Sequence, residues 1–173
     1  MSAQILLVDD NPTNLQVLYQ TLEGQGYRLL AARSGKDAIA IAERAAPDLI
    51  LLDVMMPDLD GFETCARLKA DDRTRDSAII FLSALTEPRE KARGLDLGAV
   101  DFVNKPFQAE EVLARVRTHL TIRELQQQLR LPRHQVVGAD PPLAHQARTA
   151  HDPPRPHFGA RGRPLRSQRR FTN

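Results

Sequence analysis

The sequence has one cysteine, no tryptophan and few aromatic residues of any kind. The lone Cys65 cannot form an internal disulfide, and no cysteine and histidine spacing is typical of a structural zinc site. No apolar run approaches the roughly 20 residues that a bilayer-spanning helix needs, so a transmembrane protein is excluded. The N-terminus also lacks the basic stretch of a secretory signal, and its apolar run stops at Asp9 and Asp10. We therefore expect a cytoplasmic protein with no membrane contact.

The composition changes abruptly near residue 131. Residues 1–130 hold 16 Lys and Arg against 20 Asp and Glu, whereas residues 131–173 hold 8 Arg, 2 Asp and no Lys. The second segment also contains 7 of the 12 prolines and 4 of the 5 histidines. Because it has almost no apolar periodicity, it cannot bury enough surface to offset chain entropy. The sequence predicts one domain followed by a disordered Arg/Pro-rich tail over residues 131–173.

Five apolar runs recur along the first 130 residues, and each is typical of a β-strand. Most are continuous rather than alternating, as strands covered on both faces by helices require, so a parallel sheet is favoured. The weaker second run indicates an edge strand. The runs are Ile5–Val8, Arg28–Ala32, Leu49–Leu52, Ala78–Leu82 and Val100–Val103.

Between these runs the apolar residues recur at the spacing of a helix. Strict alternation of strand and helix predicts a doubly wound α/β domain with right-handed crossovers. The last helix begins after Pro106 and continues beyond the domain as a helical extension over residues 122–130. The other helices are expected around Leu15–Leu22, Ala38–Ala45, Gly61–Ala70 and Glu87–Leu97.

Polar side chains stand where four of the strands end. In an open parallel sheet these carboxyl ends meet at one edge. Three carboxylates there repel one another, and oxygen ligands suit Mg²⁺ as the cation that offsets the repulsion. A lysine can reach a phosphoryl oxygen, a serine can donate a hydrogen bond to it, and a carboxylate can attack phosphorus. The residues at these ends are Asp9–Asp10, Asp53, Ser83–Ala84 and Lys105–Pro106.

The order and spacing of these residues resemble a response-regulator receiver domain. The resemblance covers residues 4 to about 121, and it implies a flavodoxin-like fold with the strand order 2-1-3-4-5 and a receiver domain over residues 1–121. The motifs that carry it are Ile5–Asp10, Asp53 followed by Met56-Pro57 and Gly61, Ser83–Ala84, and Gly98–Phe107.

The resemblance also implies a role for each residue at this edge. Asp53 would be the phosphoacceptor, and Mg²⁺ would be held by Asp9, Asp10, Asp53 and the backbone carbonyl of Met55. The phosphoryl group would be bound by Ser83, the backbone of Ala84 and Lys105. Ser83 and Phe102 would be the switch residues, and the Lys105–Pro106 peptide bond would be cis.

The function implied is that of a phosphoacceptor response regulator in a two-component phosphorelay. A sensor histidine kinase or phosphotransfer protein would supply the phosphoryl group, and the surface of the fourth helix, fifth strand and fifth helix would change. Such a protein accepts a group rather than turning over a substrate, so an enzyme is not expected. The family tunes autodephosphorylation at the positions of Met55 and Leu85. Both residues are apolar here and would hinder an attacking water, so we expect a long-lived phosphoryl state. A homodimer rests on family analogy alone.

Other interpretations of the sequence are open beside this one. A flavin-binding carrier shares the fold, but the loop Asp9–Asn14 is acidic and lacks the glycines that cradle a phosphate. A phosphatase-type hydrolase with an aspartyl nucleophile is a nearer rival, although no segment resembles a substrate-covering cap. Nucleic-acid binding through the arginines between Arg155 and Arg170 is not expected, because no reading element accompanies them. The abrupt tail is also what a frameshifted or truncated output domain would produce.

Overall fold

The computed structural model describes residues 2–84 and 87–130. Within them five strands alternate with five helices, as the apolar spacing predicts. The strands are β1 (Gln4–Val8), β2 (Arg28–Ala32), β3 (Leu49–Asp53), β4 (Ala78–Ser83) and β5 (Asp101–Asn104). The helices are α1 (Pro12–Leu22), α2 (Gly35–Ala45), α3 (Gly61–Ala70), α4 (Pro88–Asp96) and α5 (Ala109–Leu129). Leu85 and the predicted disordered tail, residues 131–173, lie outside the described residues.

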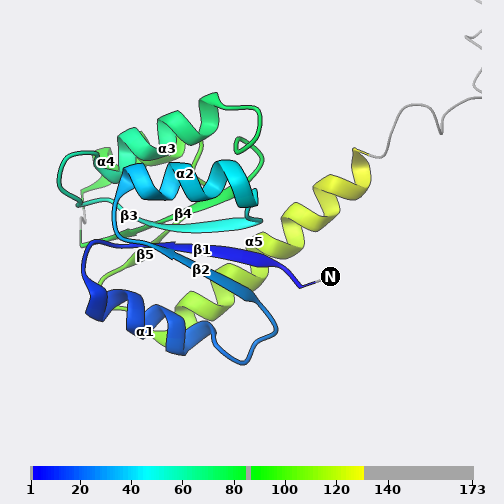
Figure 1. Ribbon diagram of the computed structural model, residues 1–173, viewed down its shortest axis with the longest axis horizontal. Helices are drawn as coiled ribbons and strands as arrows, with labels where there is room; N and C mark the ends of the chain where they lie inside the picture. The colour runs from blue at the N-terminus through cyan, green and yellow to red at the C-terminus, as the bar shows by residue number, and fades with distance from the viewer. Residues whose placement is uncertain (1, 85–86, 131–173) are drawn as a thin grey trace, which may run out of the picture. The chain divides into compact units, whose positions relative to one another are not determined.

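The strands form one parallel sheet in the order β2-β1-β3-β4-β5, which confirms the predicted flavodoxin-like doubly wound fold. The weak second run is an edge strand, as expected. The expected fifth strand is displaced by one residue, because the segment Val100–Val103 pairs with β4 only from Asp101 onward. Helices α2, α3 and α4 cover one face of the sheet, and α1 and α5 cover the other (Figure 1).

The two helical layers explain why the strands read as continuous apolar runs. Successive side chains of a strand point to opposite faces, so in β1 Leu6 and Val8 join the cluster under α2 and α3. Ile5 and Leu7 join the second cluster, under α1 and α5. All four side chains are almost completely buried. The sheet is therefore a packed platform whose carboxyl edge is held in a fixed position.

The last turns of α5 are attached to the domain by ion pairs. Arg123 Nη1 lies 2.8 Å from Asp48 Oδ1, and Arg130 Nη1 lies 3.0 Å from Asp76 Oδ1. Asp48 precedes β3 and Asp76 precedes β4, so both contacts lie at the amino edge of the sheet, opposite the predicted site. The extension over residues 122–130, expected to run beyond the domain, is thus in contact with it.

None of the helices in the described ranges is both long enough and apolar enough to cross a bilayer.

Candidate functional site

Three carboxylates meet at the carboxyl edge of the sheet, because β1 ends before Asp9 and Asp10 and its neighbour β3 ends at Asp53. One oxygen from each of the three residues lies within 4.8 Å of the others. Asp9 and Asp53 are buried, whereas Asp10 is more exposed. The sequence-predicted acidic cluster is therefore present as a compact set of oxygen donors that is open on one side.

Lys105 joins this cluster from the end of β5. Its Nζ lies 3.0 Å from Asp9 Oδ2 and 3.0 Å from Asp53 Oδ1. The strand end is held in place because Lys105 N donates a hydrogen bond to the carbonyl of Ser83, at 2.9 Å. The peptide bond from Lys105 to Pro106 is cis. The ammonium thus bridges two carboxylates that come from residues about 50 and 100 positions away in the chain.

Burial dominates the electrostatics of Asp53. The pKa of Asp53 is raised to about 6: loss of water on burial is the largest cause, the hydrogen bond from Lys105 opposes the rise, and the charge of Asp9 adds to it. Burial also acts on Lys105 by lowering its pKa, but the bonds to Asp53 and Asp9 outweigh this and raise the pKa overall. Three carboxylates beside one ammonium also leave the cluster with an excess of negative charge. A cluster of oxygen donors with uncompensated negative charge fits a hard divalent cation such as Mg²⁺.

Asp9 is held by more donors than the sequence indicates. Its Oδ1 accepts a hydrogen bond from Asn11 N at 2.9 Å, and its Oδ2 accepts one from Asn14 Nδ2 at 3.2 Å. Lys105 Nζ donates to the same Oδ2. Sequence analysis missed Asn14. The available signal was its place in the first turn of α1, which begins at Pro12, shortly after the acidic pair.

The loop between β3 and α3 shapes the site around Asp53. Met55 N donates a hydrogen bond to Asp53 Oδ1 at 3.3 Å, while the Met55 side chain is 66% exposed. Gly61 opens α3, and its N donates to the carbonyl of Val54 at 2.9 Å. A Cβ at Gly61 would collide with the Asp53 carbonyl oxygen, so only glycine allows this close approach.

Ser83 and Ala84 lie at the end of β4, between the ends of β3 and β5. Ser83 is buried and is paired with Asn104 in the register of the two strands. Ala84 follows it and is exposed. Both predicted phosphoryl-binding positions therefore reach the same edge as Asp53 and Lys105.

Phe102 lies away from the carboxylates, in the apolar layer under α4. Its ring centroid is 5.3 Å from that of Phe81, which in turn is 5.2 Å from that of Phe62. Gly94 of α4 fits against this stack, because a Cβ there would approach Phe102 Cζ to 2.5 Å. The predicted switch residue is thus half-buried in contact with the helix whose surface is expected to change.

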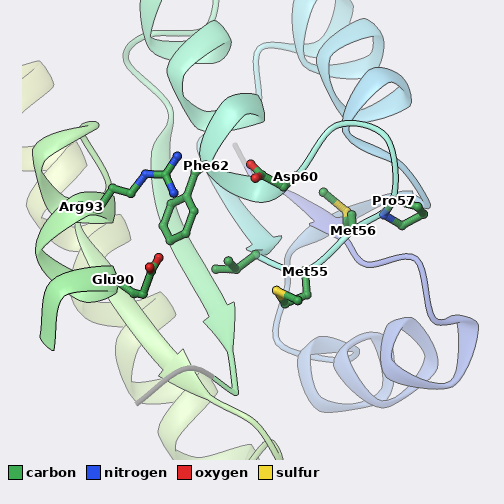
Figure 2. Close-up of a pocket in the computed structure, with 8 residues that line it drawn as sticks. Met55, Met56, Pro57, Asp60, Phe62, Glu90 and Arg93 are labelled. Atoms are coloured by element: carbon green, nitrogen blue, oxygen red, sulfur yellow. The ribbon is translucent and has the colours of Figure 1, made fainter. Parts of the chain in front are cut away.

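A pocket of about 630 Å³ lies between α4 and the β3–α3 loop, which follows Asp53 in the chain. Figure 2 shows Met55, Met56 and Pro57 of the β3–α3 loop on one side, and Glu90 and Arg93 of α4 on the other. The Arg93 guanidinium lies over the Phe62 ring, 4.5 Å from its centroid. This contact was not foreseen from the sequence, because no local pattern links the two helices.

The fold and the site define a class of signalling domain in which a buried aspartate at the edge of a parallel sheet lies beside an acidic pair and a lysine. The chain belongs to this class: residues 5–117 match the response regulator receiver domain family. Receiver domains take phosphoryl groups from histidine kinases, and phosphorylation is a general property of the family.

Two curated relatives illustrate what such domains are joined to. The DNA-binding dual master transcriptional regulator RpaA of Synechocystis sp. is 44% identical over 117 residues, which are 68% of this chain and 48% of that protein. A probable cyclic di-GMP phosphodiesterase of Vibrio cholerae is 42% identical over 116 residues, 67% of this chain and 26% of that protein. The chain thus spans half or less of the length of these relatives. Its matched part is the receiver domain, which is not itself an enzyme.

A solved structure matches along nearly its whole length. The receiver domain of the sensor histidine kinase PA1611 from Pseudomonas aeruginosa is 32% identical, with a TM-score of 0.65. The match covers 70% of this chain and 99% of that one. That structure holds a magnesium ion coordinated in its active-site cleft.

Proposed function

We propose that Asp53 accepts a phosphoryl group from a sensor histidine kinase or a phosphotransfer protein, and that the α4-β5-α5 surface changes in response. The observation that carries this proposal is the position of Lys105 Nζ, 3.0 Å from both Asp9 Oδ2 and Asp53 Oδ1 at a buried sheet edge. Such an ammonium can transfer its contact from Asp53 to a phosphoryl oxygen that arrives there. The expected cytoplasmic location belongs to the same proposal.

The residues that would hold Mg²⁺ are Asp9, Asp10, Asp53 and the backbone carbonyl of Met55. Support comes from the donor set, since one oxygen from each carboxylate lies within 4.8 Å of the others and Lys105 alone does not balance their charge. When bound, the cation would neutralise negative charge on the carboxylates and on the incoming phosphoryl group.

The proposed transfer is a displacement at phosphorus. A carboxylate oxygen of Asp53 forms a bond to phosphorus while the phosphorus–nitrogen bond of the donor phosphohistidine breaks, and the departing imidazole nitrogen takes a proton from solvent water. Asp53 acts as the carboxylate, and its pKa of about 6 in the metal-free protein leaves it ionised at neutral pH. The Ser83 hydroxyl and the backbone N–H of Ala84, at the same sheet edge, would donate hydrogen bonds to the transferred group.

The proposed output runs from Ser83 to Phe102. Movement of Ser83 toward the phosphoryl group would vacate space beside the end of β4, and the half-buried Phe102, which already packs on Phe81, would turn further inward into that space. Because Gly94 packs on Phe81 and Phe102, a turn of Phe102 would change how α4 packs against these rings. In this proposal residues 1–121 form the receiver, and residues 122–130 carry the signal onward as part of α5. A homodimer remains an analogy with the family, and nucleic acid is not a proposed partner.

Labelling with acetyl phosphate tests the proposal without a cognate kinase. The wild-type protein should be phosphorylated in Mg²⁺ and not in EDTA, whereas Asp53→Asn should not be labelled in either condition. Asp58→Asn, in the neighbouring loop, is the matched control and should be labelled like the wild type. Full labelling of Asp53→Asn would contradict the assignment of the phosphoacceptor.

A further inference from the structure

The carboxylate of Asp9 is the most enclosed charge in the described part of the chain. Its side chain is 0% exposed, so each oxygen needs hydrogen-bond donors from the protein. Oδ1 accepts from Asn11 N, and Oδ2 accepts from both Asn14 Nδ2 and Lys105 Nζ. Oδ2 thus accepts hydrogen bonds from a neutral amide and from a charged ammonium.

The proposed function requires Lys105 to move and allows Asn14 to stay in place. Lys105 also contacts Asp53 Oδ1 and is proposed to turn to the phosphoryl group, which weakens its hold on Asp9. Asn14 makes no comparable second contact within residues 2–84 and 87–130, and it stands on the first turns of α1, where the Asn11 cap and Pro12 fix the backbone. It can therefore remain on Asp9 throughout.

We propose that Asn14 is a positioning residue that keeps the Asp9 carboxylate oriented toward the cation when Lys105 transfers its contact to the phosphoryl group. Its amide leaves Oδ2 a hydrogen bond that does not depend on Lys105, so a buried carboxylate is not left without a side-chain donor. It also restrains rotation of the Asp9 side chain, as outer-shell donors do for metal-ligating carboxylates. This inference rests on the proposed function, because it takes Asp9 as a cation ligand.

The direct test is Mg²⁺ binding measured by isothermal titration calorimetry on the full chain. Asn14→Leu removes the donor at similar volume and should weaken Mg²⁺ binding about tenfold, the lower end of the effect of outer-shell ligand partners. Asn14→Gln keeps the amide and should bind more tightly than Asn14→Leu. Gln16→Leu, an amide lost from an exposed position of the same helix, should bind like the wild type.

A second measurement is independent of the metal. In EDTA, Asn14→Leu should lower the urea midpoint of unfolding more in a Lys105→Met background than in the wild type, because Asp9 Oδ2 then loses both side-chain donors. Equal decreases in the two backgrounds would contradict the shared role. If the wild type binds no Mg²⁺, the proposed function fails; if it binds Mg²⁺ and Asn14→Leu binds equally well, this inference alone fails.

Discussion

Replacing Asp53 by asparagine should stabilise the metal-free protein at neutral pH, although it removes the proposed phosphoacceptor. The pKa of Asp53 rises from 3.8 to about 6, chiefly because the carboxyl group is buried. A group whose pKa is higher in the folded than in the unfolded protein contributes its stability fully below the unfolded value. That contribution is lost as the pH rises through the folded value. The wild type should therefore lose stability between about pH 4 and pH 6 through this residue.

The size of the effect follows from the change in pKa. A tenfold change in a protonation equilibrium corresponds to about 1.4 kcal/mol, so ionised Asp53 costs up to about 3 kcal/mol above pH 7. Asparagine carries no charge at any pH, but it leaves Lys105 with one carboxylate partner fewer. We expect the free energy of unfolding of Asp53→Asn to exceed that of the wild type by roughly 1–3 kcal/mol at pH 7.5. The difference should shrink toward zero near pH 4.

Urea denaturation in EDTA across this pH range, followed by far-ultraviolet circular dichroism, measures the difference directly. Asp72→Asn is the control, because the Asp72 side chain is 87% exposed and its loss should change stability by less than about 0.5 kcal/mol. Added Mg²⁺ should reverse the order, since a thousandfold excess over the dissociation constant stabilises the wild type by about 4 kcal/mol. The reasoning would be refuted if Asp53→Asn were less stable than the wild type at pH 7.5. It would also be refuted if the difference in free energy of unfolding between the two proteins were the same at pH 4 and pH 7.5.

Three further predictions concern other parts of the site and fold. Gly61→Ala should destabilise the protein by about 1–3 kcal/mol in urea unfolding and reduce acetyl phosphate labelling, because its Cβ would collide with the Asp53 carbonyl. Full retention of stability and labelling would show that the loop can move to accommodate the Cβ. Arg123→Ala should cost about 1 kcal/mol at low salt, since the Arg123 side chain is only 15% exposed and its guanidinium pairs with Asp48, and Arg89→Ala on α4 serves as an exposed control. Phosphoryl loss from the labelled protein in Mg²⁺ should take minutes or longer, given the apolar Met55 beside Asp53, and decay within seconds would rule out this effect.

The fold could be predicted because the burial of each strand and helix determines which of its positions are apolar. Strands covered on both faces, such as Leu49–Leu52, must be apolar at every position, and the helices between them must be apolar on one side. The meeting of Asp9, Asp10, Asp53 and Lys105 followed from topology, since the carboxyl ends of parallel strands share an edge. The tail was predicted from composition, and it lies outside the described residues.

Other features could not be predicted because they depend on contacts between distant side chains. Arg123 and Asp48 are 75 residues apart in the chain, and neither lies in a periodic pattern that would pair them. The same holds for Arg93 over Phe62. Asn14 is a polar residue near a helix start, where such residues commonly serve the local backbone, so only the geometry shows that its amide reaches Asp9.

The central claim is that Asp53 is the residue that becomes phosphorylated, and reductive trapping tests it most directly. Borohydride reduces an aspartyl phosphate to homoserine, so the protein is treated with acetyl phosphate and Mg²⁺, reduced, digested and sequenced by mass spectrometry. We predict homoserine at position 53, and none when EDTA replaces Mg²⁺. Homoserine at Asp9 or Asp10 instead, or a stable phosphoryl group on a hydroxyl side chain, would contradict the claim.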